Sequence, residues 1–305
     1  MKKTISIALV LVIAVFSLTA CSAEAKTYKD AVSAYDAGDY QKAVELLNTI
    51  PDYDDSKDIR KQATARIDFN FAVESVTAKN TELDATITPA QALLDENKTP
   101  LDPTTLTNLQ VAISSAKEAK REITDMPTET ERIIAETETL NAPLDYSEFI
   151  TSLNNSKTAL ENSIKQLEQV TNPTGDFVIL CLKEVSGIVD IQGVTEDNDP
   201  NGNLNKAGGY TSQTYFSSEL INQADVFGDN LIDKGTSAGG SIEVYATVED
   251  AEKRNTYLAG FDGGILSSGS HEVIGTVIIR TSDELTASQQ KDLSARIKEK
   301  LIELK

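Results

Sequence analysis

The spacing of apolar residues changes at one point of this chain, the segment Asn172-Pro173-Thr174-Gly175, and this change limits the fold more than any other feature. Before it, apolar residues recur three, four or seven positions apart, as they do on helices that bury one face. Most of the glycines come after it, where short apolar runs are separated by turn residues, a pattern typical of strands. We therefore expect a multi-domain chain in which an all-α part is followed by a domain with a sheet.

The region 67–172 is predicted to be a helical bundle or stalk. Each of its helices has one apolar face to bury, and short proline-containing breaks favour antiparallel neighbours. The two clearest stripes are Leu106, Leu109, Ile113, Ala116 and Ile123, and Phe149, Leu153, Leu160, Ile164 and Leu167.

Four local patterns predict where these helices begin. Thr88-Pro89-Ala90-Gln91 and Thr128-Glu129-Thr130-Glu131 have the spacing of capping boxes. The pair Asp102-Pro103 places a capping residue before a proline at the first helical position, and Asp145 begins a similar pattern.

The region 176–305 is predicted to form a two-layer α+β module, with helices over a largely antiparallel sheet. The predicted strands are Ile188–Ile191, Tyr215–Phe216, Ile242–Ala246 and Val273–Ile279. The predicted helices are Phe177–Val185 with Asp176 as its cap, Glu249–Phe261, and a last helix that Thr286 caps.

The region 27–66 is predicted to be a helical hairpin. Gly38 interrupts the helix, Asp39 caps the second one, and Ala43 permits close packing. With Tyr40 and Leu47, these residues resemble one tetratricopeptide-like unit. Because solenoids need several stacked units before they offer a concave surface, the match implies a hairpin that packs on the next helix.

The N-terminus has the three parts of a secretory signal. A basic start, Met1-Lys2-Lys3, precedes an apolar run from Ile5 to Leu18 that is too short for a comfortable membrane span. Small residues then lead to a cysteine in Leu18-Thr19-Ala20-Cys21. Residues 1–20 are therefore predicted to be removed on export.

The ending Leu18-Thr19-Ala20-Cys21 resembles the lipobox of bacterial lipoproteins. The resemblance implies cleavage before Cys21, a diacylglycerol group on its thiol, and acyl chains such as palmitate. Residues 21–26 are then a lipidated tether, and the chain is extracytoplasmic and held to the cell membrane by its lipid. The alternative is an ordinary cleaved signal with an incidental cysteine.

The charge of the chain limits its partners, and its cysteine content limits its disulfides. The chain has 28 Lys and Arg against 48 Asp and Glu, so its acidic surface repels nucleic acid and anionic headgroups. Cys181 is the only cysteine besides Cys21. It lies in an apolar run, where we expect a small buried hydrophobe, and lipid on Cys21 leaves no pair for a disulfide.

Parts of the chain resemble Gram-positive surface proteins. The helical region loosely resembles the bundles of surface adhesins. Residues 176–305 resemble an uncharacterised module of surface lipoproteins, a family with no established activity, so the resemblance implies a location and no chemistry. The segments that carry it are Val194–Gly202, Gly208–Thr211, Ile242–Tyr245, Glu249–Asn255 and Ser268–His271.

The segment from Asp197 to Gly202 matches the opening of a calcium loop, with Asp197, Asp199 and Asn201 as candidate ligands. Position 208 is Gly where such loops carry a bidentate Glu, and Pro200 is unusual inside one. The same residues also suit a tight turn between strands, because Asp and Asn side chains bond to nearby backbone. Calcium is the only cofactor that the sequence suggests.

The pattern Gly235-Thr236-Ser237-Ala238-Gly239 resembles a hydrolase nucleophile elbow, and Asp262 and His271 follow in the matching order. An elbow needs a helix after the serine, whereas Ser241–Thr247 is predicted to be a strand. Coincidence in a Gly- and Ser-rich loop is the interpretation that we favour. His271 is the only histidine, which excludes a multi-histidine metal centre.

Four aromatic residues of the module suit either of two roles. Tyr210, Tyr215, Tyr257 and Phe261 can stack on a glycan or peptide, or they can pack in the core. The sequence as a whole predicts a membrane-anchored extracytoplasmic lipoprotein that presents a small α+β binding module on a helical stalk. An extracellular protein or a glycan is the expected partner. The alternatives are an extracellular or cell-wall-directed hydrolase and a structural spacer.

Overall fold

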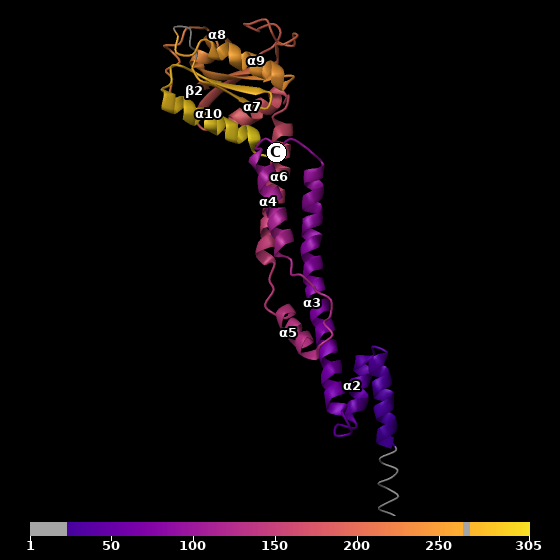
Figure 1. The fold of residues 1–305 in the computed structure, drawn as a ribbon. Coiled ribbons are helices and arrows are strands. Elements are labelled where there is room, and N and C mark those ends of the chain that lie inside the picture. Colours follow the sequence, from indigo (N-terminus) through magenta and orange to yellow (C-terminus); the bar gives the residue numbers. More distant parts are fainter. Residues whose placement is uncertain (1–22, 265–268) are drawn as a thin grey trace, which may run out of the picture. The chain divides into compact units, whose positions relative to one another are not determined.

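The computed structural model describes residues 23–264 and 269–305, so the signal segment 1–20 and Cys21 lie outside the described residues. The chain forms two compact units (Figure 1). One comprises residues up to Gln91 together with Ala112–Asn154, and the other comprises Ala92–Val111 together with Asn155–Lys305. Among the helices of the described ranges, none has the length and apolarity that crossing a membrane requires. The predicted fold class, helices followed by an α+β domain, is confirmed.

The first unit begins with the expected hairpin, made by a helix over residues 23–36 and α2 (Tyr40–Asn48). Gly38 has φ +81° in the turn, and the Asp39 carboxylate accepts the backbone N–H of Lys42 at 3.1 Å. Ala43 is fully buried against Ala34 and Ala63, so the hairpin packs on the next helix.

That next helix, α3 (Ser56–Asp95), contradicts the predicted helix start at Thr88, because it continues through Pro89 for 40 residues. The Thr88 hydroxyl donates to the carbonyl of Asp84 inside the helix instead of capping a new one. Ile87 and Ala90 are buried on either side of the proline. Continuous burial of this face offsets the roughly 3 kcal/mol that an interior proline costs a helix.

Three shorter helices follow: α4 (Thr104–Ala119), α5 (Thr130–Leu140) and α6 (Ser147–Gln169). Two predicted caps are confirmed, since the Asp102 and Asp145 carboxylates each accept a backbone N–H from the start of the following helix at 2.9 Å. The predicted capping box at Thr128 is wrong. Glu129 precedes α5 and makes no side-chain cap bond.

The second unit contains a five-stranded antiparallel sheet in the order β1-β2-β3-β5-β4. Its strands are β1 (Ile188–Gly193), β2 (Tyr210–Ser218), β3 (Gly239–Tyr245), β4 (His271–Ile274) and β5 (Val277–Thr281). The unit also includes the first half of α4 and most of α6. After residue 172 its helices are α7 (Gly175–Lys183), α8 (Leu231–Lys234), the 3₁₀ helix η1 (Gly235–Ala238), α9 (Val248–Ala259) and α10 (Ala287–Ile302).

Two details of the module differ from the prediction. The apolar run 273–279 is a hairpin of two strands, because Gly275 turns the chain with φ +58° against the carbonyl of Val170. Thr174 caps α7 in place of Asp176. The capping box at Thr286 is confirmed, with Gln289 as its second member.

The two faces of the sheet differ in character. In Figure 1, α7 and α10 lie on one side of the sheet, while α8 and α9 lie on the other. The face under α7 and α10 is apolar and packs against Cys181 of α7, which is a buried hydrophobe as predicted. Burial raises the pKa of the Cys181 thiol to about 11. Its largest buried members are Phe216, Leu182, Ile242, Ile279 and Ile297.

Candidate functional site

The face of the sheet under α9 buries polar and charged side chains. Side chains alternate along β3, so Ile242 and Val244 enter the apolar core while Ser241, Glu243 and Tyr245 face α9. Glu243 and Ser241 are both completely buried. A buried carboxylate is stable only when its charge is compensated and its oxygens are hydrogen-bonded.

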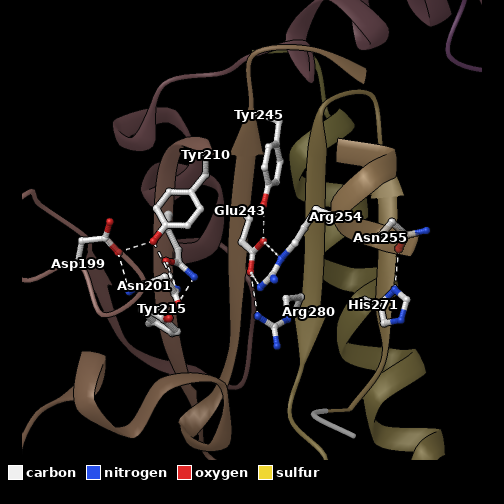
Figure 2. Close-up of polar contacts among 11 residues, drawn as sticks. Asp199, Asn201, Tyr210, Tyr215, Glu243, Tyr245, Arg254, Asn255, His271 and Arg280 are labelled. Atoms are coloured by element: carbon white, nitrogen blue, oxygen red, sulfur yellow. Dashed lines mark hydrogen bonds and ion pairs between the residues drawn. The ribbon is translucent and has the colours of Figure 1, made fainter. Parts of the chain in front are cut away.

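Three side chains satisfy the Glu243 carboxylate (Figure 2). Its Oε2 accepts the Arg254 Nε–H and the Tyr245 hydroxyl, both at 2.9 Å. Its Oε1 accepts Arg254 Nη2 at 3.0 Å and Arg280 Nη1 at 2.8 Å. These bonds join α9 to the neighbouring strands β3 and β5.

The electrostatics of this cluster keep it charged. Burial by itself raises the pKa of the Glu243 carboxyl, but the bonds and charges of Arg254 and Arg280 outweigh burial and lower the pKa. Burial and the carboxylate beside it raise the pKa of the Tyr245 hydroxyl far above its ordinary value, so that hydroxyl stays a donor. Two guanidinium groups are thereby held in fixed positions on the sheet.

A pocket of about 430 Å³ opens beside this cluster, between α9 and η1. None of the described residues that line it is acidic, although the chain has 48 Asp and Glu residues. Three of them are cationic and three are aromatic. The lining residues are Asn201, Tyr215, Lys234, Gly235, Thr236, Ser237, Arg254, Tyr257, Leu258, Phe261 and Arg280.

Aromatic rings from α9 and the loop after it form one wall of this pocket. Tyr257 and Phe261 stand edge to face, with ring centroids 5.0 Å apart and planes at 69°. Arg254 lies over the Tyr257 ring at 5.4 Å. Tyr257 is 58% exposed, which leaves much of its surface open to a ligand. Of the four aromatic residues considered from sequence, three line the pocket, while Tyr210 is buried in the core.

The loop that was a calcium candidate contributes one residue, Asn201, to the pocket lining. The Asp199 carboxylate accepts the backbone N–H of Asn201 at 3.0 Å, that of Leu204 at 2.8 Å, and the Tyr210 hydroxyl (Figure 2). Burial opposes ionisation of Asp199, but these bonds outweigh it and lower the pKa. Asn201 reaches the pocket, where its amide donates to Gln213 at 3.5 Å.

Within the described ranges, no three acidic, histidine or cysteine side chains are grouped to hold a metal ion. Calcium binding by Asp197, Asp199 and Asn201 stays a prediction. Thermal unfolding with and without calcium tests it, with Asp197→Ala as the variant because Asp197 takes no part in the bonds that shape the loop.

The residues of the hydrolase hypothesis do not form a triad. His271 Nδ1 lies 2.6 Å from the Asn255 amide oxygen and Nε2 lies 3.3 Å from Asp262, so both ring nitrogens are engaged. His271 is on the edge strand β4, whereas Ser237 is in η1, which packs on β2 and β3. The strand β5 separates them in the sheet.

The glycines of the Gly235–Gly239 pattern and its neighbour have a packing role. A Cβ at Gly240 would stand 2.4 Å from the Phe216 ring and 2.2 Å from the carbonyl of Arg280. A Cβ at Gly239 would stand 2.6 Å from the Ser218 backbone nitrogen. Close approach of neighbouring strands therefore explains glycine at these two positions.

Two other hollows lie against α2 and α3 in the first unit. The larger has a volume of about 570 Å³, and its lining mixes Lys57, Arg60 and Lys61 with Asp58 and Asp68. The smaller has about 230 Å³. Neither is lined by a buried charged side chain, since in the described part of the chain those are Glu243 and Arg280. We therefore place the candidate site in the module despite its smaller volume.

Comparison with known proteins yields no match to a family model, a curated protein or a solved structure. The site therefore rests on its own geometry. Sequence reasoning missed Lys234, Glu243, Arg254 and Arg280, which carry its charge. One signal was present: Glu243 and Arg280 are opposite charges inside two apolar strand segments, a pattern that indicates a buried pair.

Proposed function

We propose that this protein is a membrane-anchored extracytoplasmic lipoprotein whose C-terminal module binds a small ligand, with the helices before it as a stalk. The observation that carries the proposal is the pocket beside Glu243, which combines three cations with three aromatic rings. Ligand sites are concave and use placed polar groups to orient a ligand. This pocket is concave too, and polar and charged groups make up most of its lining beside the three rings.

A binding role explains the buried charges better than a spacer role does. Burying the Glu243 carboxylate and the Arg280 guanidinium costs several kcal/mol per ion before pairing returns part of it. The opposite face of the sheet already supplies an apolar core under α7 and α10. A module that only separated two ends of a chain would gain nothing from such a cluster beside a pocket.

The anchoring part of the proposal is supported by the basic start, the apolar run and the lipobox-like ending at Cys21. It is tested by expressing the full chain in a bacterium that processes lipoproteins, grown with labelled palmitate. We expect label on the wild-type chain, partition into detergent, and loss of both with Cys21→Ala. Equal labelling of the variant, or no labelling of either chain, would contradict anchoring at Cys21.

The binding part is tested by thermal unfolding of the full chain carrying Cys21→Ser, screened with a library of neutral and charged sugars, amino acids and short peptides. A ligand at about 100 times its Kd should add about 2.7 kcal/mol of stability. Tyr257→Ala should abolish the shift, whereas the matched control Phe227→Ala, at a residue that is 97% exposed outside the pocket, should keep it. A library without any shift, or shifts equal in both variants, would overturn the proposal.

A further inference from the structure

We propose that the ligand of this pocket is an anionic sugar: a pyranose-sized ring that carries a carboxylate or phosphate group. This inference rests on the proposed function and names the ligand class of the same site. The cations receive the acidic group, the rings of Tyr257 and Phe261 contact the sugar face, and polar side chains contact its hydroxyls.

The cationic lining of the pocket indicates a negatively charged ligand. Lys234, Arg254 and Arg280 supply three positive charges. Glu243 binds both guanidinium groups from beneath, and its single negative charge leaves the cluster with a net positive charge. Lys234 belongs to none of the ion pairs found among the described residues, and its ammonium donates to the neutral carbonyl of Gln223 at 2.7 Å. A positive pocket in a chain of net charge −20 concentrates anions locally and favours an acidic ligand.

The aromatic wall points to a ring. Tyr257 and Phe261 present apolar surface at the pocket while their own edge-to-face contact holds them in place. Aromatic faces provide contact area at low entropic cost, and the aliphatic face of a sugar ring is flat enough to lie on one. A pocket of about 430 Å³ is at the small end of ligand sites, which suits one or two sugar rings.

The remaining groups are hydroxyls and an amide, which suit sugar hydroxyls. Thr236, Ser237 and Asn201 line the pocket. Ser241 lies beneath it, in register between Tyr215 on β2 and Arg280 on β5, both of which line the pocket. The Ser241 hydroxyl is fully buried without a hydrogen-bond partner among the described residues, and a buried hydroxyl gains from one.

The position of the pocket favours a sugar over an extended peptide. A peptide strand gains most of its affinity by adding to a free sheet edge, here β1 or β4. This pocket instead lies over strands inside the sheet, where Tyr215 of β2 and Arg280 of β5 contribute side chains. None of the described lining residues belongs to the edge strands β1 and β4. We therefore expect a single sugar ring, or the terminal ring of a longer sugar, to occupy the pocket.

Isothermal titration calorimetry on the full chain carrying Cys21→Ser tests the inference. The probes are D-glucuronate, D-glucose 6-phosphate, D-glucose and the tripeptide acetyl-Ala-Ala-Ala with its free carboxylate. We expect one acidic sugar or both to bind at least about tenfold more tightly than glucose, since one charge-assisted contact is worth about that factor. The two acidic sugars separate carboxylate from phosphate recognition. Raising NaCl from 0.05 to about 0.5 M should weaken acidic-sugar binding.

Two variants, the first with a matched charge control, locate the binding. Lys234→Gln should weaken binding of the acidic sugar by about tenfold while leaving glucose unchanged. Lys253→Gln removes an equal charge from α9 at a residue that pairs with Glu249 outside the pocket, and it should have no effect. Tyr257→Ala should weaken binding of acidic and neutral sugars alike. Both test residues are at the pocket surface, so their loss should leave the fold intact.

The outcomes separate this inference from the proposed function. Glucose binding as tightly as glucuronate, with Tyr257 required, would overturn the acidic ligand and keep the binding site. Tighter binding of the tripeptide than of any sugar would assign a peptide carboxylate instead and overturn the sugar. Acidic-sugar binding that Lys253→Gln weakens as much as Lys234→Gln does would be a surface charge effect and would also overturn the inference. A chain that binds none of the probes but shifts with another library compound overturns only the sugar; no binding of any compound overturns both.

Discussion

The helical part of the chain and the sheet-bearing module bury different kinds of side chain. Among the described residues, the buried polar side chains of the region 23–172 are uncharged: Ser56, Thr105, Thr137 and Ser163. The region 173–305 buries eleven polar side chains, and these include Glu243 and Arg280. Apolar stripes are therefore enough to hold the helices, whereas the module keeps a polar interior that costs stability and lines a pocket. The comparison shows that, among the described residues, the buried charged side chains lie in the module.

The largest loss in the free energy of unfolding is expected from Glu243→Ala. It leaves Arg254 and Arg280 without their common partner, and breaking a buried pair costs about 3–5 kcal/mol. The matched change in the helical part is Asp84→Ala, which breaks a partly exposed pair with Lys120 and should cost about 1 kcal/mol or less. Urea unfolding followed by circular dichroism measures both. Similar losses from the two changes would remove the difference between the regions.

Gly240→Ala is expected to lower the free energy of unfolding by about 3 kcal/mol, because the new Cβ would clash with Phe216 and with the β5 backbone. Its counterpart is Gly38→Ala in the helical hairpin, where φ is +81° but no atom lies within 4 Å of the new Cβ. Only backbone strain of about 1 kcal/mol applies there. The same urea experiment compares them, and a larger loss from Gly38→Ala would show that strand crowding had been overestimated.

In the helical part, the most sensitive polar contact is predicted to be that of Tyr146. Its hydroxyl donates to Asn80 and accepts the backbone N–H of Arg121, both at 2.7 Å. Tyr146→Phe leaves these groups unsatisfied and should cost about 1–2 kcal/mol. Amide hydrogen exchange should show faster exchange near Arg121 and no change in β2, β3 or β5. A change in the sheet would contradict the local character of this contact.

The smallest effect is a change in acid sensitivity. The pKa of Glu243 is lower in the folded chain than the unfolded value of about 4.3, so its ionised form stabilises the fold above that pH. This contribution is lost as the pH falls through the folded pKa. Stability between about pH 4.3 and the folded pKa should therefore fall less steeply in Glu243→Gln than in the wild-type chain. Parallel curves from thermal unfolding at stepped pH would contradict this assignment.

The accuracy of the sequence predictions differs between the helical part and the module. The stripes through Leu109 and Leu153 are local and repeat at the helical period, so they predicted buried helix faces. Ile123 was wrongly included in the first stripe, because α4 ends at Ala119. The helix start predicted at Thr88 was wrong because residues on both sides of Pro89 are buried, which keeps α3 continuous. That burial cannot be read from the sequence. In the module, strands and the Thr286 cap were predictable, whereas Val273–Ile279 proved to be two strands.

The site was harder to predict because its parts come from distant segments. Arg254 on α9 reaches Glu243 on β3, and Arg280 joins them from β5. No spacing in the sequence encodes that meeting, since it depends on strand register and on the packing of α9. The short motif around Ser237 was visible but did not mark a triad, because glycine at positions 239 and 240 serves the close approach of neighbouring strands.

Deuterium exchange of the full chain carrying Cys21→Ser tests most directly the claim that the module and not the helices carries binding. It is measured with and without a saturating concentration of a compound that binds in the calorimetry or in the library screen. We predict slower amide exchange in η1, in α9 and in the loop that holds Asn201, with α2 and α3 unchanged. Protection confined to α2 and α3, or no protection anywhere in the module, would contradict the account.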